Sequence, residues 1–250
     1  MRRMHQPAAL RHQGWRLFID MTIINYSHRF LYIHVPKTAG TAVKEYLRPY
    51  MCDSDICIRA KHDVEQLLAR DLKAPAKHSS APQIRDLLGA ADFESFFRFS
   101  FSRNPYGRTV SLFRFLKYTF REWQNSSVMD GFDTLEQFVT SPFFDRPGPG
   151  RIMEPQVRWL CDDEKKNCLT FIGRLERLET DMAAVLTALN LPAVRKPVGR
   201  KNESRGGRLE TAAELVSGRV VDAIRSRYAD DFEFLGYSVE PDDAIGETAD

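Results

Sequence analysis

The stretch FLYIHVPKTAGTAVKEYL, residues 30–47, predicts a β-strand, a tight loop and a helix in that order. Its first six residues form a short, apolar, β-prone run, and Pro36 ends that run. Beyond Thr41, apolar residues stand at positions 43, 46 and 47, which is the spacing of one helix face. We therefore place a loop containing Lys37 and Gly40 between a buried strand and a helix N-terminus.

A loop in this position is suited to an anion, because the N–H groups at a helix N-terminus are unpaired and the helix dipole is positive there. Gly40 allows close approach of the backbone, and Thr38 and Thr41 add hydroxyl donors. Lys37 adds a cation on a long side chain. The pattern is neither GxxxxGK[ST] nor GxGxxG, and a plain turn with a surface lysine explains about a third of such loops.

A second stretch, FFRFSFSRNPYGRTVSLFRFL at residues 96–116, predicts the same order of strand, turn and helix. Asn104 followed by Pro105 is typical of a helix start. Arg103 stands at the strand end, and Ser111 follows two helical turns into the helix. Arginine binds phosphate through two parallel hydrogen bonds, and a serine hydroxyl can share that oxyanion. A structural ion pair or a surface position explains either residue alone, but the two loops together predict a ligand with two phosphate-like groups.

The rest of the chain continues to alternate between strands and helices, which predicts an α/β fold. We expect a mostly parallel sheet flanked by helices, with ligands at the carboxyl ends of its strands. The remaining expected elements are a third strand at 169–172 and helices at 64–72, 82–88, 175–189 and 211–228.

The composition is that of a globular protein. The 250 residues include 36 Lys+Arg and 34 Asp+Glu, a net charge of +2, and 43% are hydrophobic, which excludes disorder, collagen and coiled coil as overall descriptions. There is no apolar run of membrane-spanning length and no signal-peptide pattern, so we expect a cytoplasmic protein without a transmembrane segment. The four cysteines lack metal or redox spacing, and we interpret them as free thiols.

The charge distribution along the chain is uneven. Residues 195–208 hold six basic residues and one acid, so this segment is either a loop for polyanion contact or a solvated surface loop. We expect a single domain at 29–237, preceded by an N-terminal extension at 1–28. An acidic tail at 238–250, expected to be disordered, follows it.

The two loops as a pair, PKTAGT at 36–41 and RNPYGRTVSL at 103–112, resemble motifs of the sulfotransferases that use 3′-phosphoadenylyl sulfate (PAPS). The resemblance is to the carbohydrate branch, which includes the heparan sulfate 2-O-sulfotransferases and bacterial relatives. The segments KHSSAPQIRDLLG, FIGRLERLETDM and RYADDFEFLGY support it, so it extends from about residue 30 to 237. It implies a P-loop-like nucleotide-binding core of the sulfotransferase type.

The resemblance also implies roles for individual residues. Lys37 and His78 are the implied catalytic residues, with Lys37 at the bridging oxygen of the phosphosulfate and His78 as general base. Ala42 departs from the pattern, because relatives often have serine there. The implied binding residues are Lys37, Thr38, Ala39, Gly40 and Thr41 for the 5′-phosphosulfate, Arg103 and Ser111 for the 3′-phosphate, and Arg200 and Lys201 in a late loop that closes over the nucleotide.

Sulfuryl transfer relies mainly on in-line positioning and on stabilisation of the leaving phosphate, so a lysine suffices and no metal is required. The acceptor hydroxyl needs a base, and histidine titrates in the suitable range. His62 and a carboxylate such as Glu94 are the alternatives to His78. His34 lies inside the first strand, where we expect a packed core residue.

The sequence leaves other functions open. An ATP- or GTP-dependent phosphotransferase also has phosphate loops, although the Walker A lysine is missing. A non-enzymatic polyanion-binding protein would use the basic segment, but it would leave the two loops unexplained. The expected partner is a carbohydrate or another hydroxyl-bearing acceptor and not a nucleic acid. The identity of the acceptor and the oligomeric state are not predicted.

Overall fold

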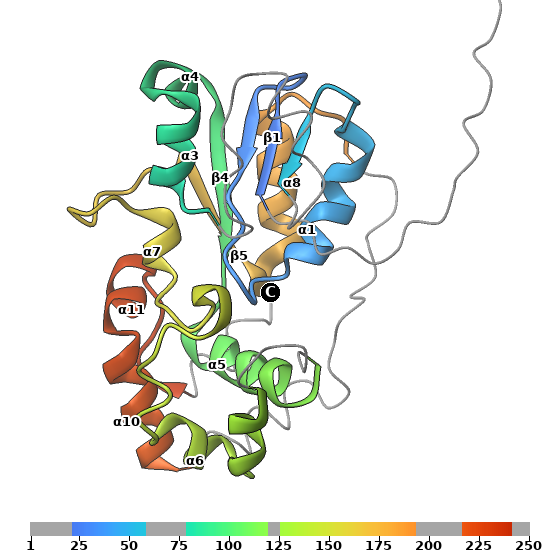
Figure 1. Ribbon diagram of the computed structural model, residues 1–250. Helices are drawn as coiled ribbons and strands as arrows, with labels where there is room; N and C mark the ends of the chain where they lie inside the picture. Colours follow the sequence, from blue (N-terminus) through green and yellow to red (C-terminus); the bar gives the residue numbers. More distant parts are fainter. Residues whose placement is uncertain (1–21, 59–78, 120–125, 194–216, 242–250) are drawn as a thin grey trace, which may run out of the picture.

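The computed structural model describes residues 22–58, 79–119, 126–193 and 217–241, and all structural statements refer to these ranges. Within them a five-stranded sheet lies in the upper half of the molecule and a group of helices lies below it (Figure 1). The strands follow one another in the sheet in the order β3-β1-β2-β4-β5. They are β1 (Thr22–Asn25), β2 (Phe30–Tyr32), β3 (Ile56–Ile58), β4 (Phe97–Ser102) and β5 (Phe171–Arg174).

The sheet is mixed, whereas the sequence pattern predicts a mostly parallel sheet. The three predicted strands β2, β4 and β5 do pair in parallel. The two strands that were not predicted add antiparallel pairings, because β1 pairs with both β2 and β3 in that sense. Only four residues separate β1 from β2, which is too short for a parallel crossover and forces a hairpin. β1 lies within the stretch 1–28 that the sequence places ahead of the domain.

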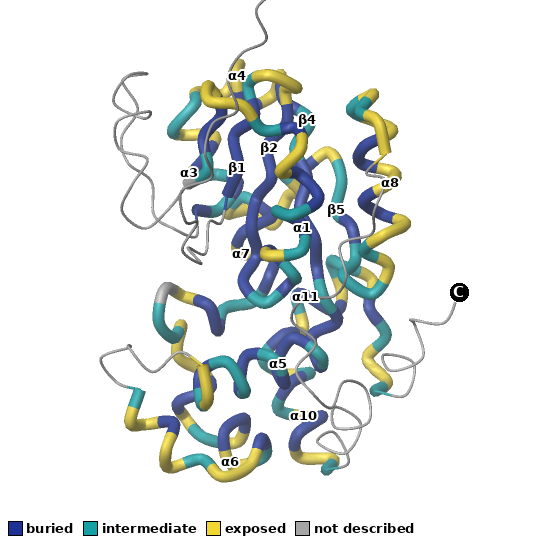
Figure 2. The backbone as a smooth tube through the Cα atoms, turned by 90° about the vertical axis from the view of Figure 1, so that its right-hand side faces the viewer, coloured by how far each residue is buried: buried dark blue, intermediate teal, exposed yellow. Residues whose placement is uncertain are grey.

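Helices cover both faces of the sheet (Figure 1). Side chains on β2 alternate between the two faces, so Leu31 contributes to one apolar core and Phe30 and Tyr32 to the other. The helices are α1 (Gly40–Leu47) and α8 (Leu178–Ala188) on one face, and α3 (Ala81–Leu88), α4 (Ala90–Ser95) and α7 (Val157–Leu160) on the other. Figure 2 shows the central strands buried and the outer side of α8 exposed.

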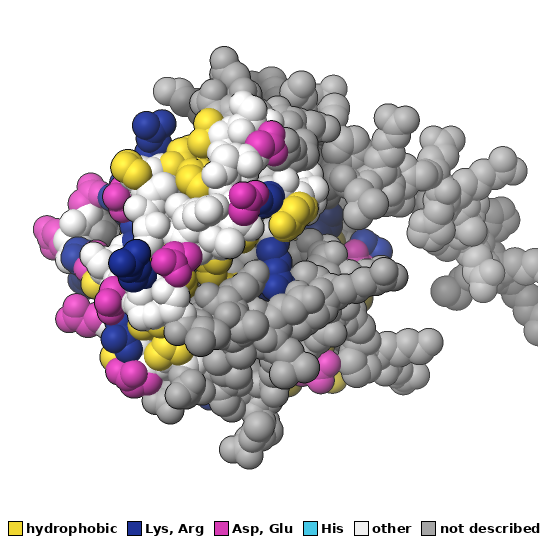
Figure 3. Space-filling model, turned by 90° about the horizontal axis from the view of Figure 1, so that it is seen from below, with side chains coloured by type: hydrophobic (Ala, Val, Ile, Leu, Met, Phe, Trp, Pro, Cys, Tyr) yellow, Lys and Arg dark blue, Asp and Glu magenta, His cyan; other side chains and the backbone are white. Residues whose placement is uncertain are grey.

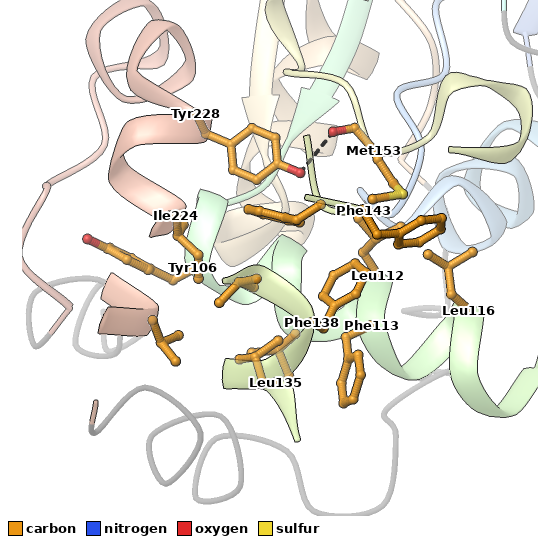
Figure 4. Packing of buried hydrophobic residues seen from close by; sticks show 14 of the residues in the cluster. Tyr106, Leu112, Phe113, Leu116, Leu135, Phe138, Phe143, Met153, Ile224 and Tyr228 are labelled. Atoms are coloured by element: carbon orange, nitrogen blue, oxygen red, sulfur yellow. Dashed lines mark hydrogen bonds between the residues drawn. The ribbon is translucent and has the colours of Figure 1, made fainter. Parts of the chain in front are cut away.

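A third core lies among the helices below the sheet (Figure 4). Aromatic side chains dominate it, with Phe138 packed against Phe113, Phe143 and Phe144 at centroid separations of 5.3–6.2 Å. The one polar group of the buried Tyr228 side chain, its hydroxyl, donates a hydrogen bond to the Met153 carbonyl at 2.9 Å. The helices of this part are α5 (Pro105–Arg114), α6 (Leu135–Val139), α10 (Gly218–Arg227) and α11 (Ala229–Leu235).

Short irregular helical segments complete the described chain. A π-helical segment, Phe115–Thr119, continues α5. The 3-10 turns are Arg48–Tyr50, Ser126–Gly131, Pro149–Arg151 and Leu175–Arg177. No helix in these ranges is both apolar enough and long enough to span a bilayer. All four cysteines are free thiols, as expected.

Most of the predicted elements are present in the described ranges, with small shifts. The first strand–loop–helix unit, the second unit and the helix at 82–88 are confirmed by β2 and α1, by β4 and α5, and by α3. The third strand begins two residues later than predicted, and the helix expected at 175–189 begins with a 3-10 turn before α8. The helix expected at 64–72 lies outside the described residues.

Candidate active site

The loop between β2 and α1 has an unusual backbone. Lys37 and Ala39 adopt left-handed conformations, with φ of 70° and 64°. This conformation costs an L-residue about 1–2 kcal/mol, and such residues cluster where a backbone is shaped for a ligand. α1 begins at Gly40, and its N-cap residue Ala39 provides no side-chain cap for the first N–H groups of the helix. The loop therefore presents backbone donors at the carboxyl end of β2.

The His34 side chain packs closely against Gly40, the first residue of α1. Its imidazole is buried, and a Cβ added at Gly40 would lie 2.0 Å from His34 Nε2. Glycine is therefore required at this position by close approach, although its φ is not positive. His34 is a packed residue, as the sequence predicts.

This contact yields a stability prediction. We expect Gly40→Ala to destabilise the protein by about 1–3 kcal/mol, because a methyl group must displace the imidazole. His34→Ala should restore part of that loss in the double variant. Thermal unfolding of the variants measures it, with Gly218→Ala as the control, since Gly218 also opens a helix but has nothing within 4 Å of its Cβ position. A Gly40→Ala protein as stable as wild type would contradict the packing.

The two threonines of the loop differ in role. The Thr38 hydroxyl is fully buried and donates to the Val35 carbonyl at 2.8 Å. This hydrogen bond stabilises the loop from inside and engages the Thr38 hydroxyl proton with the backbone. Thr41 is exposed at the first turn of α1. Among the predicted hydroxyl donors of this loop, Thr41 is the one placed to reach an anion.

The second loop brings Arg103 to the adjacent parallel strand. β4 ends at Ser102, and Asn104 caps α5 by accepting the N–H of Tyr106 at 3.0 Å. The Arg103 guanidinium lies over the first turn of α5, since a Cβ at Gly107 would be 3.3 Å from Arg103 Nε. Ser111 stands four residues after Gly107, on the same helix face and one turn further. Arg103 and Ser111 therefore lie near one another, as their proposed shared ligand requires.

Arg108, which no sequence pattern singles out, connects the helix after the second loop to the start of the first loop. It is only 1% exposed, and its Nε donates to the Pro36 carbonyl at 3.1 Å. Its Nη2 donates to the carbonyls of Ile152 and Glu154, each at 3.0 Å. Its Nη1 is buried without a hydrogen-bond partner among the described residues. Such an unsatisfied donor is costly, so a group that accepts from it would stabilise this site.

Positive charges converge where the two loops meet. The pKa of Lys37 is lowered to about 8 by burial and by the nearby charges of Arg103 and Arg108. Burial also lowers the pKa of Arg103, although the Glu176 carboxylate opposes this, and Arg114 adds a further like charge. Like charges lower one another's pKa only when they lie close together. An anion bound here would relieve their mutual repulsion.

The π-helical segment after α5 also reaches this site. Lys37 Nζ lies 4.0 Å from the centroid of the Phe115 ring, which is a cation–π contact. π-helical turns are frequent at functional sites. The Lys37 ammonium therefore contacts an aromatic ring as well as lying near the charges of the two arginines.

The structure thus brings together the residues of both predicted loops. The predicted residues that lie outside the described ranges are His78, His62, Arg200 and Lys201. Glu94, an alternative base, lies on α4 at the opposite end of β4 and pairs with Arg98 at 2.9 Å. It is therefore far from the loops (Figure 1).

Two further residues of the site gave no local signal in the sequence. Gln156 is fully buried and forms two hydrogen bonds with the backbone of Arg103. Glu176, after β5, accepts the N–H of Asn104 at 2.8 Å and the hydroxyl of Tyr237 at 3.1 Å. Both hold the second loop from segments more than 50 residues away.

The fold and site define an α/β protein in which two strand–loop–helix units bring Lys37, Arg103 and Arg108 together at the carboxyl ends of adjacent parallel strands. The sequence profile of the Sulfotransferase family matches residues 20–238, and the chain belongs to that family. Membership supports a function in sulfuryl transfer. No curated protein and no solved structure matches the chain significantly.

Proposed function

We propose that the protein transfers the sulfuryl group of PAPS to a hydroxyl of an acceptor, which we propose to be a carbohydrate. The observation that carries this proposal is the convergence of Lys37, Arg103 and Arg108 between two strand–loop–helix units. PAPS carries a phosphosulfate and a separate 3′-phosphate, so it matches two neighbouring anion sites. A protein that binds one phosphate would need only one of them.

The described residues fit this substrate. The loop from Lys37 to Thr41 would bind the 5′-phosphosulfate through backbone N–H groups at the start of α1. Arg103 and Ser111 would bind the 3′-phosphate. Arg108, whose Nη1 has no partner among the described residues, bonds to the Pro36 carbonyl at the start of the first loop. We propose that Arg200 and Lys201 add contacts from the late basic segment.

The proposed step breaks one bond and forms one. The acceptor oxygen attacks sulfur, its bond to sulfur forms, and the bond from sulfur to the bridging phosphate oxygen breaks. The electron pair of that bond remains on the phosphate of adenosine 3′,5′-bisphosphate, where the Lys37 ammonium stabilises the charge. The hydroxyl proton passes to His78 as general base.

The alternative function, a non-enzymatic polyanion-binding protein, has less support from the charges on the described surface. Figure 3 shows Lys and Arg side chains interspersed with Asp and Glu over the described part of one face, without a field of a single sign. A general polyanion binder needs basic side chains gathered on one face.

Calorimetric titration with adenosine 3′,5′-bisphosphate tests the proposal directly. We expect saturable binding in the presence of EDTA, with AMP and ATP bound at least about tenfold more weakly because each lacks the 3′-phosphate. Equal binding of ATP, or activity that EDTA abolishes, would favour a phosphotransferase. Selective binding would be followed by a screen of carbohydrate acceptors with PAPS.

A further inference from the structure

Gln156 occupies an unusual position beside Arg103. It immediately precedes α7, and its side chain is fully buried. The Arg103 N–H donates to Gln156 Oε1 at 2.9 Å, and Gln156 Nε2 donates to the Arg103 carbonyl at 2.8 Å. The side-chain amide thus makes the pair of hydrogen bonds that a residue of a neighbouring strand would make.

These bonds are needed because Arg103 belongs to neither a strand nor a helix. β4 has ended at Ser102 and α5 begins at Pro105, so regular structure does not fix the backbone of Arg103. Among the described residues, Gln156 is the hydrogen-bond partner of both the Arg103 N–H and the Arg103 carbonyl. A change in backbone direction here is carried along the whole side chain to the guanidinium.

Gln156 is itself held by a buried carboxylate. Its N–H donates to Asp231 Oδ2 at 2.8 Å, and the N–H of Val157 donates to Oδ1 at 3.0 Å. Asp231 is fully buried on α11, and the charge of nearby Arg108 opposes the rise in its pKa that burial causes. Gln156 therefore connects α11 to the second loop through hydrogen bonds.

We propose that Gln156 is a positioning residue that directs the Arg103 guanidinium toward the 3′-phosphate and so determines selectivity for a 3′-phosphorylated nucleotide. This inference rests on the proposed function. A misplacement of about 1 Å at such a group has a large effect on binding and rate. Gln156 itself makes no contact with the substrate in this proposal.

The test is Gln156→Met, which keeps the volume of the side chain and removes both hydrogen bonds. We expect affinity for adenosine 3′,5′-bisphosphate to fall about tenfold, while affinity for AMP, which lacks the 3′-phosphate, changes less than about twofold. Calorimetry with both ligands measures the ratio. Gln137→Met is the control, because exposed Gln137 also bonds to backbone N–H groups, but on α6.

A double variant shows whether the effect passes through Arg103. In an Arg103→Ala background, Gln156→Met should cause no further loss of affinity for adenosine 3′,5′-bisphosphate, because the group that it positions is gone. If the two losses are additive, Gln156 does not act through Arg103 and the inference is overturned.

The remaining outcomes are distinct. Unchanged selectivity in Gln156→Met, or an equal loss for both nucleotides, would show a merely structural role and overturn the inference while the proposed function stands. A wild-type protein that does not prefer the 3′-phosphorylated nucleotide would overturn both. If the Met variant does not fold, Gln156→Asn gives the same comparison, because its shorter amide cannot keep both bonds.

Discussion

Replacing Lys37 with alanine is expected to lower kcat by about 10²–10³-fold, the usual cost of removing one group that stabilises charge in the transition state. The charge on the leaving phosphate develops as its bond to sulfur breaks, so the ammonium contributes most at that point. Affinity for adenosine 3′,5′-bisphosphate should fall much less, because Arg103 and the backbone of the loop remain. Steady-state kinetics with PAPS and calorimetry with the product measure the two effects.

Lys44→Ala is the matched control, because Lys44 lies on α1 in the next helical turn after the loop. That variant should keep kcat within about twofold of wild type, if the effect of Lys37→Ala comes from the position of the ammonium at the leaving phosphate and not from the loss of one positive charge nearby. Near-normal kcat in Lys37→Ala would remove Lys37 from the proposed mechanism.

The pH dependence gives a second measurement of the same role. Burial and two neighbouring arginines lower the pKa of Lys37 to about 8, so the free protein loses this positive charge as pH rises above about 8. We therefore expect kcat/KM to fall above that pH. A bound phosphosulfate favours the ammonium and raises its pKa, so the fall in kcat should lie at higher pH. A kcat/KM that stays constant to pH 10 would contradict the role.

The parts of the site that could be predicted from sequence are those with local signals. Pro36 ends a strand, and Asn104 with Pro105 starts a helix, so both strand–loop–helix units follow from neighbouring residues. The parallel pairing of β2 with β4 then brings their carboxyl ends together. That single tertiary fact connects Lys37 with Arg103.

The residues that could not be predicted act over long sequence separations. Gln156 and Glu176 hold the backbone of the second loop from 53 and 72 residues away. Buried polar residues that satisfy distant backbone groups have no periodicity and no fixed spacing. Arg108 stands within a predicted helix, but only the tertiary structure shows that it bonds to the carbonyl of Pro36.

The missed strands have a simpler cause. β1 lies in the stretch 1–28, which we placed ahead of the domain, and β3 covers only Ile56–Ile58 in a stretch without a clear strand pattern. Their pairing depends on the hairpin with β2 and on a shared apolar face. The mixed character of the sheet follows from these two strands, while the site depends only on the parallel pair.

Arg103→Ala is expected to weaken binding of adenosine 3′,5′-bisphosphate by about 30- to 150-fold, which corresponds to roughly 2–3 kcal/mol for charge-assisted hydrogen bonds to a phosphate. Binding of AMP should be nearly unchanged. The pKa of Lys37 should rise, because the charge of Arg103 contributes to lowering it, so the fall in kcat/KM should move to higher pH. Calorimetry with both nucleotides and a pH–rate profile measure these effects.

The electrostatics also predict what this variant does to the unliganded protein. Arg103 is repelled by Arg108 and Lys37 and attracted by Glu176, so its removal should leave thermal stability nearly unchanged even as affinity falls. Arg177→Ala is the control, since exposed Arg177 follows β5 and lies 3.6 Å from Asp181. An affinity for adenosine 3′,5′-bisphosphate that survives Arg103→Ala would place the 3′-phosphate elsewhere. Loss of stability together with equal loss of both nucleotides would instead make Arg103 a structural residue, and the two-phosphate site would then rest on Lys37 and Arg108 alone.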